Sequence, residues 1–264
     1  MKRHPERAAA PARSIDLNAD MGEGFGRYRL DEKALWARVT SASIACGFHA
    51  GDPVVMRDTV ATAMSHCVTI GAHPGYPDLT GFGRRDLAAS PAEVEAIVVY
   101  QIGALQGVCA AAGGRLRYVK PHGSLYNRAA RDVPTAEAIA RAVHSVDPSL
   151  ALLGLAGSAM MDAAARMGVR GVNEAFVDRA YRSDGTLVPR SEAGAVLTNV
   201  DAIAERALGM VESQTVQAVD GTVISVLAES LCTHGDGPDA IAIVRAVRAR
   251  LERAGVILAS FMRD

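Results

Sequence analysis

The sequence predicts an α/β fold in which a parallel sheet closes into a β/α barrel. From Ser14 onward, short apolar runs alternate with longer helical patterns, and no linker-like stretch divides the chain. This alternation favours a parallel sheet with helices outside it, either closed as a barrel or open and doubly wound. The chain has neither a GxGxxG after a strand nor a GxxxxGK[ST], so the best positive evidence for a nucleotide-binding open sheet is missing. We therefore expect a barrel, as one domain over residues 14–264.

Each expected element follows from its apolar pattern. The expected strands are 14–20, 42–48, 67–73, 117–122, 151–156, 171–178 and 222–233, with 256–261 as a candidate eighth, edge-like strand. The expected helices lie near 31–39, 53–66, 91–112, 133–146, 158–168, 199–213 and 238–254. Pro53, Pro91 and Pro134 each stand at a helix start, where a missing N–H costs nothing. Ser90 before Pro91, with Glu93 behind it, indicates an N-cap and an acid in the first turn.

Composition excludes several classes of partner. The chain has 264 residues, a formal net charge of −1 and 49% hydrophobic residues, which is ordinary for a soluble globular protein. Its near-neutral charge gives no electrostatic reason to expect a nucleic acid or an anionic membrane as partner. The four cysteines form no CxxC pair, which argues against a zinc knuckle or a disulfide scaffold.

Targeting signals are also missing from the sequence pattern. No run approaches the roughly 18 apolar residues of a membrane span. The first thirteen residues carry charge and proline but lack the apolar stretch that a signal peptide needs. We expect residues 1–13 to be a disordered tail and the protein to be cytoplasmic, with no membrane partner.

Polar residues in the first strand point toward the inside of the barrel. Asp16, Asn18 and Asp20 alternate with apolar residues, so the three share one face. The outer face of a strand covered by helices should be apolar, which turns this polar face inward, where uncompensated carboxylates are costly. A structural alternative is that these groups hydrogen-bond the following loop, 22–26.

Histidines stand at the ends of four expected strands. His49, His73, His122 and His234 are each followed by a glycine within two residues. One such histidine has a ready structural explanation, but four coincidences favour a site. The loops after barrel strands converge on one mouth, where active sites form. We therefore expect Asp20, the four histidines and Glu174 to surround one cavity.

Other candidates share these strand ends. Lys120 lies on the same strand face as His122, and Glu174 shares a face with Asp178, while Arg179 faces the other way. A buried lysine without an anionic neighbour would lose its charge. Lys120 therefore needs either a carboxylate partner, Asp20 or Glu174, or an anionic ligand.

The motifs at these positions resemble the LamB/YcsF family. They are, in order, IDLNADMGEGFG, ASIACGFHAGD, IGAHPGYPD, FGR, YQIGAL, VKPHGSLYN, GLAGS, EAFVDRAY, DGTLVPR and HGDG, and they span about residues 14–260. The resemblance implies an irregular seven-stranded β/α barrel similar to that of the polysaccharide deacetylases. One departure is Asn173, where the family usually has an acid.

The resemblance also implies an activity, the opening of 5-oxo-L-proline to L-glutamate with ATP as co-substrate. The implied partners are 5-oxoprolinase subunits B and C, to which the phosphoryl step is better assigned because this chain shows no phosphate-cradling loop. The catalytic candidates are Asp20, His49, His73, Lys120, His122 and Glu174. The substrate-binding candidates are Asn18, Asp52, Asp178, Arg179, Arg190, His234 and Asp236.

The roles within this set stay open. Asp20 or Glu174 could activate water, and Lys120 could hold a phosphoryl group or a developing oxyanion as a mobile point charge. His122 or His73 could protonate the departing nitrogen. Arg179 or Arg190 could pair with the substrate carboxylate.

Two rival functions remain. One is a metal-dependent deacetylase or related carbohydrate hydrolase, with Asp20, His49 and His73 as ligands of a catalytic zinc-type ion, although spacing along the chain cannot establish a metal. The other is a protein that binds a small acid without catalysis. The density of titratable groups at strand ends argues against a mere binder.

Overall fold

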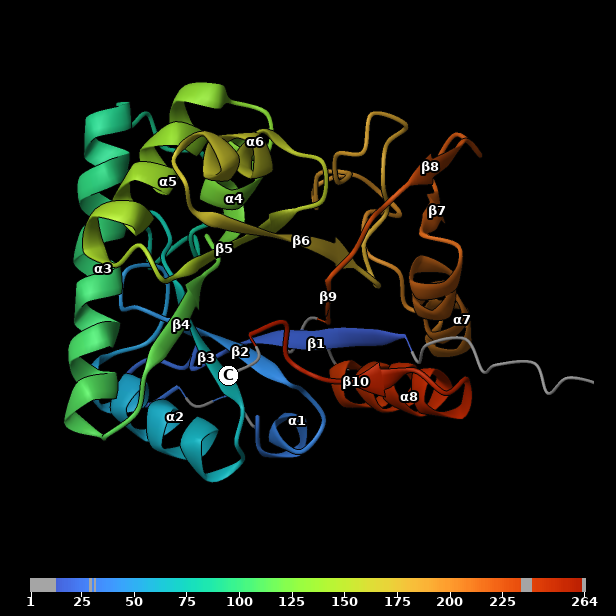
Figure 1. Cartoon of the computed structure of the whole chain (residues 1–264), viewed down its shortest axis with the longest axis horizontal. Coiled ribbons are helices and arrows are strands. Elements are labelled where there is room, and N and C mark those ends of the chain that lie inside the picture. The colour runs from blue at the N-terminus through green and yellow to red at the C-terminus, as the bar shows by residue number, and fades with distance from the viewer. Residues whose placement is uncertain (1–12, 29, 31, 234–238, 263–264) are drawn as a thin grey trace, which may run out of the picture.

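Seven parallel strands pair edge to edge around the centre of the fold (Figure 1). The computed structural model describes residues 13–262 apart from 29, 31 and 234–238. In ring order the strands are β1 (Ser14–Met21), β2 (Ser41–Ala45), β3 (Thr69–His73), β4 (Leu116–Val119), β5 (Ala151–Leu155), β6 (Arg170–Phe176) and β9 (Ser230–Cys232). Strand β9 pairs with both β6 and β1, and this double pairing closes the ring. The predicted closed barrel is confirmed.

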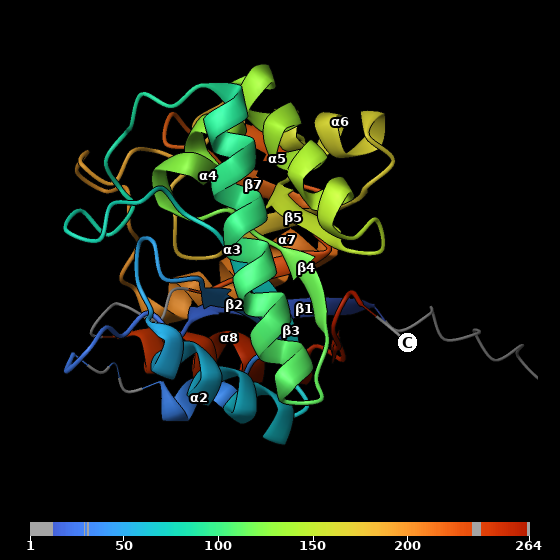
Figure 2. The ribbon, with the colours of Figure 1, turned by 90° about the vertical axis from the view of Figure 1, so that its left-hand side faces the viewer.

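Helices cover the outside of this ring (Figure 1). They are α1 (Lys33–Trp36), α2 (Pro53–Ser65), α3 (Pro91–Ala111), α4 (Gly123–Ala129), α5 (Val133–Val146), α6 (Ala159–Arg166), α7 (Val200–Glu212) and α8 (Ala240–Arg253). The long helix α3 runs across the barrel wall, with α5 beside it (Figure 2). Helix α4, directly after His122, was missed from the sequence because seven residues carry too little periodicity to show.

The helix starts follow the predicted chemistry. Ser90 and Glu93 form a full capping box at α3, in which Ser90 Oγ accepts from Glu93 N at 3.3 Å and Glu93 Oε2 accepts from Ser90 N at 2.7 Å. Pro53 and Pro91 each open their helix, and Pro134 is the second residue of α5. These caps fix where the outer helices begin and therefore where the loops at the barrel mouth end.

The expected strand 222–233 is wrong as one element. It divides into β8 (Val223–Ser225), which pairs antiparallel with β7 (Thr215–Gln217), and the barrel strand β9. Between them the chain leaves the sheet, and Leu227 is exposed. A continuous apolar run cannot reveal such a break, because hairpin and barrel strands have similar composition. The candidate eighth strand is present as the two-residue β10 (Ile257–Leu258), which pairs with β1 outside the ring.

Two further expectations concern the first residues of the chain and the absence of a membrane-spanning segment. Residues 1–12 of the expected disordered tail lie outside the described residues. The expectation that no segment resembles a membrane span is wrong, because α3 is long and apolar enough to span a membrane when only its length and composition are considered. In the structure α3 packs against α2, α5 and β3, and Val94, Val98 and Ile102 are fully buried.

Gly71 in β3 lies against the aromatic ring of Tyr118, and a substitution at Gly71 tests this contact inside the barrel. A Cβ at Gly71 would fall on the ring atoms of the fully buried Tyr118, closer than real Cβ contacts occur. Gly71→Ala is therefore expected to lower the free energy of unfolding by about 1–3 kcal/mol or more. The matched control is Gly103→Ala in α3, where nothing lies within 4 Å of the new methyl group. The control should gain up to about 1 kcal/mol from helix propensity. Denaturant unfolding of both variants checks the pair, and equal stability would contradict this packing.

A buried carboxyl group stands inside the barrel below the strand ends. Asp16 is 1% exposed and accepts hydrogen bonds from Thr40 Oγ1 and Ser41 Oγ, both at 2.6 Å, and from Ser230 Oγ. The inward direction predicted for Asp16 is thus confirmed, and its partners are hydroxyl groups on neighbouring segments. Burial raises the pKa of Asp16 to about 6, although the three hydroxyl groups oppose the rise.

This raised pKa gives stability a specific pH dependence. The folded protein holds the Asp16 proton more tightly than the unfolded chain does, so protonation of Asp16 adds to the free energy of unfolding. This contribution is complete below the pKa that Asp16 has in the unfolded chain. It is lost as pH rises through about 6. The difference in unfolding free energy between the wild type and Asp16→Asn should fall by roughly 2–2.5 kcal/mol between pH 4 and pH 7. Urea unfolding of both proteins across that range measures it, and a flat difference would show that the carboxyl group titrates normally.

Candidate functional site

One cavity opens at the carboxyl ends of the barrel strands. Its volume is about 400 Å³. Four of the expected catalytic residues line it, namely Asp20, His73, Lys120 and His122. Its other polar and aromatic lining residues are Glu23, Arg84, Ser124, Tyr126, Asn127, Arg131, Phe176, Arg179, Thr186, Arg190 and Ser191.

Lys120 lies at the centre of a buried network. Its Nζ is 2.8 Å from Asp20 Oδ1 and 2.9 Å from Glu174 Oε1, and it also donates to Asn18 Oδ1 and Cys232 Sγ, both at 3.2 Å. These four acceptors outnumber the three protons of the ammonium group. Lys120 is therefore fixed in place between two carboxylates, and the expected mobile point charge for a phosphoryl group is not what the structure shows.

The charges in this network support each other. Burial by itself lowers the pKa of Lys120, but Asp20, Cys232 and Glu174 outweigh it, so the pKa lies well above its ordinary value. Burial by itself raises the pKa of Asp20, but His73 and Lys120 outweigh it and hold this pKa well below its ordinary value. At neutral pH the ammonium and the Asp20 carboxylate are both charged, and Asp20 presents its carboxylate to the cavity.

Glu174 is held behind Lys120 rather than in the cavity wall. It is fully buried, and its Oε2 accepts a hydrogen bond from Tyr126 at 2.8 Å. Asn18 is also fully buried and donates from Nδ2 to Glu174 Oε1 at 3.0 Å and to Ser230 Oγ at 2.7 Å. Neither side chain lines the cavity. Both therefore position Lys120, and the expectation that Asn18 contacts substrate and that Glu174 reaches the reacting atoms does not fit this geometry.

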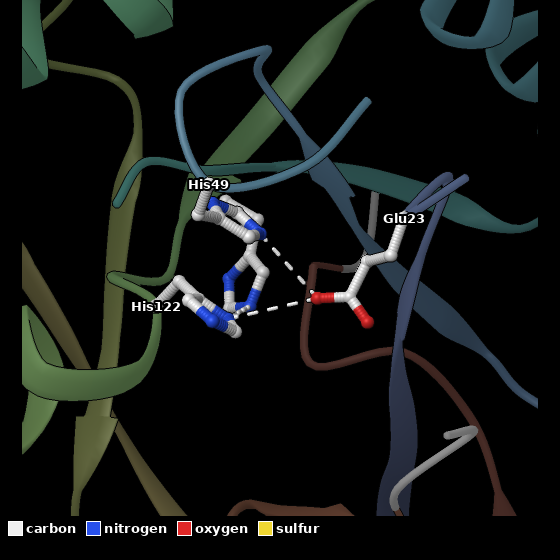
Figure 3. A group of neighbouring side chains, drawn as sticks. Glu23, His49 and His122 are labelled. Carbon is white, nitrogen blue, oxygen red and sulfur yellow. Dashed lines mark hydrogen bonds and ion pairs between the residues drawn. The ribbon is translucent and has the colours of Figure 1, made fainter. Parts of the chain in front are cut away.

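Three histidines gather beside the Asp20 carboxylate. His73 Nε2 lies 3.3 Å from Asp20 Oδ2 and 2.9 Å from His122 Nδ1. The rings of His49 and His122 stack with centroids 3.7 Å apart and an interplanar angle of 4°. Figure 3 shows Glu23 pointing at this pair, with Oε1 3.4 Å from His49 Nε2 and 3.6 Å from His122 Nδ1. One ligand atom from each of these four residues lies within 4.8 Å of the others, so this group could hold a metal ion.

Two glycines allow the backbone to lie directly against the rings of His49 and His122. A Cβ at Gly75 would lie 2.7 Å from His49 Nδ1, and a Cβ at Gly83 would lie 2.7 Å from His49 Cβ and 2.9 Å from His122 Cδ2. The backbone after β3 therefore approaches the imidazole rings as closely as glycine allows. Burial, followed by neighbouring histidines, holds the pKa values of His49 and His122 well below the ordinary value.

Arginines stand around the upper part of the cavity. Arg179 is 4% exposed and donates from Nη2 to Val188 O at 2.6 Å and from Nε to Ala195 O at 3.2 Å. Burial and the nearby Arg190 lower the pKa of Arg179 to about 10, so it stays charged at neutral pH. Strand register suggested that Arg179 faces away, but β6 ends at Phe176, and the alternation rule no longer applies three residues later. Arg179 and Arg190 together make this wall suitable for an anionic group.

Two other expected substrate contacts, Asp52 and Asp178, do not line the cavity. Asp52 caps α2, accepting from Val54 N and Val55 N at 2.8 Å, and also accepts from Gly26 N at 2.8 Å. A carboxylate directly before a helix-starting proline is an N-cap, and that signal was present in the sequence. Asp178 is buried in the turn before Arg179 and does not line the cavity. His234 and Asp236 lie outside the described residues.

Among the site residues that the sequence analysis missed, Glu23, Tyr126 and Cys232 contact the predicted ones directly. Glu23 lies in the loop after β1, where Glu32 accepts hydrogen bonds from Gly22 N and Glu23 N and so holds the loop. The sequence feature that could have identified Glu23 is an acidic residue between two glycines directly after the first strand. Tyr126 belongs to the overlooked α4. Cys232 is fully buried in β9 and accepts a hydrogen bond from Lys120.

Comparison with known proteins agrees with this architecture. The LamB/YcsF family model matches residues 15–264. The A subunit of 5-oxoprolinase from Heliobacterium modesticaldum is 54% identical over 243 residues, covering 92% of this chain and 96% of the relative. The A subunit of 5-oxoprolinase from Bordetella pertussis is 51% identical over 246 residues, covering 93% and 98%.

Solved structures extend the comparison. The lactam utilization protein from Thermus thermophilus superposes with a TM-score of 0.89 at 47% identity, covering 94% of this chain and 100% of that one. A family 4 carbohydrate esterase from Streptomyces lividans aligns with a TM-score of only 0.44 at 13% identity, which is too weak to argue from. The family match over nearly the whole chain and the identity near one half lead to one conclusion: the chain belongs to the LamB/YcsF family.

Proposed function

We propose that this chain supplies the site at which a lactam, 5-oxo-L-proline, is hydrolysed to L-glutamate in an ATP-dependent 5-oxoprolinase. The observation that carries the proposal is a single cavity lined by a charged Asp20, by His73 and His122, and by several arginines. The names of the relatives, the A subunit of 5-oxoprolinase and lactam utilization protein, support the same substrate class.

The chemistry explains why ATP and partners are needed. A five-membered lactam is a stabilised amide, and its opening is unfavourable unless it is coupled to another reaction. Phosphorylation of the amide oxygen by ATP releases ADP and makes the ring carbon electrophilic. Water then adds to that carbon, the C–N bond breaks, and phosphate departs, so the products are L-glutamate, ADP and phosphate. Within the described residues we find no glycine-rich phosphate loop, and we assign the phosphoryl step to partner subunits B and C.

The residues of the cavity divide the remaining work. Arg179 or Arg190 would pair with the substrate carboxylate, and the other would face the phosphoryl group. Asp20 is the carboxylate that reaches the cavity, so it is favoured over Glu174 for orienting the attacking water. Its low pKa makes it a weak base, so the proton of the water is better taken by His122, whose pKa burial holds well below the ordinary value and which is therefore neutral.

Proton delivery to the departing nitrogen falls to the same cluster. His73 and His122 both line the cavity and lie in contact with each other, so either can pass a proton to the nitrogen as the ring opens. Lys120 acts behind them by holding Asp20 and Glu174 in register. Because ATP is a cytoplasmic metabolite, we place the assembled enzyme in the cytoplasm.

The test is reconstitution with each component omitted. Glutamate release from 5-oxoproline and ATP should require this chain together with both partner subunits. The isolated chain should neither hydrolyse ATP nor open the ring. ATP-dependent glutamate release from the rigorously purified chain would refute the division of labour. Tight binding of 5-oxoproline without any glutamate release in the full mixture would favour the non-catalytic binding protein instead.

A further inference from the structure

Two imidazole lone pairs face each other at the base of the cavity. A carbonyl oxygen can only accept, so His73 must donate from Nδ1 to Lys120 O at 2.7 Å, and His122 must donate from Nε2 to Phe82 O at 2.8 Å. In a neutral imidazole the other ring nitrogen then carries the lone pair. Those two nitrogens, His73 Nε2 and His122 Nδ1, are 2.9 Å apart.

Such a contact requires a positive charge between the two nitrogens. Two lone pairs at this separation repel each other, and the backbone carbonyls prevent either ring from reversing its tautomer without losing a buried hydrogen bond. The charge can be a proton shared by the two rings or a metal ion bound by both. Histidines that ligate metals commonly donate their other ring N–H to a backbone carbonyl, as both do here.

His49 and Glu23 favour the metal ion. His49 is fully buried, yet neither of its ring nitrogens makes a hydrogen bond among the residues that the structure describes. A proton shared by His73 and His122 would leave that burial unexplained. His49 Nε2 and His122 Nδ1 lie 3.4 and 3.6 Å from Glu23 Oε1. A tetrahedral zinc ion with ligands at about 2.0–2.1 Å has ligand–ligand distances of about 3.3 Å, close to these values.

The ring orientations show what must move on binding. Two parallel rings 3.7 Å apart cannot both direct in-plane lone pairs at one ion, so either His49 or His122 has to turn. The carbonyl of Phe82 holds His122 in place. His49 has no comparable bond among the described residues and is the ring expected to rotate.

We propose that Glu23, His49, His73 and His122 form a binding site for one divalent transition-metal ion of the zinc class. Three imidazoles and one carboxylate suit zinc or cobalt, whereas magnesium prefers an all-oxygen site. This set differs from the Asp20, His49 and His73 trio considered from the sequence, because the ligand atoms that lie within 4.8 Å of one another belong to Glu23, His49, His73 and His122. The site is inferred from these four side chains alone, and its metal can be tested without lactam turnover. An ion bound to both His73 Nε2 and His122 Nδ1 would take the place of the proton that these two rings are proposed to deliver.

Metal titration of the full-length chain tests this site. After treatment with a chelator and its removal, the chain should bind one equivalent of Zn²⁺ in competition with a chromophoric chelator. Co²⁺ should give the intense visible absorption of a four-coordinate site, and excess Mg²⁺ should displace neither ion. His73→Ala and His122→Ala should each weaken binding by at least about 100-fold, since loss of a ligand should exceed the effect of losing an outer-shell partner.

The metal titration also needs a control variant and a check that each variant is folded. His144→Ala removes an exposed histidine on α5 and should leave the affinity unchanged. Circular dichroism confirms folding, and His122→Asn serves as the second variant if His73→Ala does not fold. A folded wild-type chain that binds no stoichiometric Zn²⁺ would overturn the proposal in favour of a shared proton. Binding that survives loss of both His73 and His122 would overturn it in favour of a surface site.

Discussion

Replacing Lys120 with methionine is expected to lower the free energy of unfolding by about 3–5 kcal/mol at pH 7, because it strips a partner from buried carboxylates. Lys120 Nζ is within 2.9 Å of oxygens of both Asp20 and Glu174, and Glu174 is fully buried. Turnover of the assembled enzyme should also fall by two or more orders of magnitude, since Asp20 loses its fixed position.

A second substitution separates the two effects. In the Lys120→Met background, Glu174→Gln removes one uncompensated charge and should recover part of the lost stability without restoring turnover. Lys33→Met, at an exposed lysine of α1, is the matched control and should change stability by less than about 0.5 kcal/mol. Denaturant unfolding and turnover on the same preparations provide both readings. A Lys120→Met protein with wild-type stability would show that Lys120 does not stabilise the buried carboxylates of Asp20 and Glu174.

Replacing Asp20 with asparagine is expected to lower turnover of the assembled enzyme by about 10²-fold or more, because the attacking water and His73 lose the carboxylate that orients them. The change keeps the shape of the side chain, and Lys120 keeps Glu174 as its partner, so the fold should survive. The carboxylate of Asp20 is the one that both lines the cavity and contacts His73.

Asp58→Asn is the control for Asp20. Asp58 is an exposed residue of α2 whose carboxylate pairs with the neighbouring, equally exposed Arg57. This variant should have full activity, because a solvent-exposed pair on an outer helix lies away from the cavity lining. Steady-state rates with both variants check the prediction, and an active Asp20→Asn enzyme would move the chemistry to another group.

Much of the barrel could be predicted from the sequence because each strand carries its own apolar run and a polar exit. Period-two alternation placed Asp16, Asn18 and Asp20 inside the ring, and all three are buried or nearly so there. Strand exits likewise placed His73 and His122 at one mouth. These successes depend on local periodicity, which a strand expresses within a few residues.

Other features depend on contacts that no local pattern records. The depth of Glu174 behind Lys120 follows from the hydroxyl of Tyr126 in α4, a helix too short to detect. Arg179 faces the cavity because β6 ends earlier than its apolar run suggests. Glu23 joins the histidines because Glu32 holds the loop from nine residues away. Each of these depends either on a contact between distant segments or on where a strand stops, and neither leaves a local pattern in the sequence.

Opening of the ring in this cavity, with ATP cleaved elsewhere, is tested most directly by measuring ADP and glutamate in one reaction mixture. The measurement compares the wild-type chain with Asp20→Asn, each assembled with its proposed partners. We expect the wild-type assembly to form the two products in equal amounts. We expect the Asp20→Asn assembly still to release ADP while its glutamate formation falls by at least about 100-fold. Glutamate release at the wild-type rate, or in unchanged proportion to ADP, would contradict this assignment.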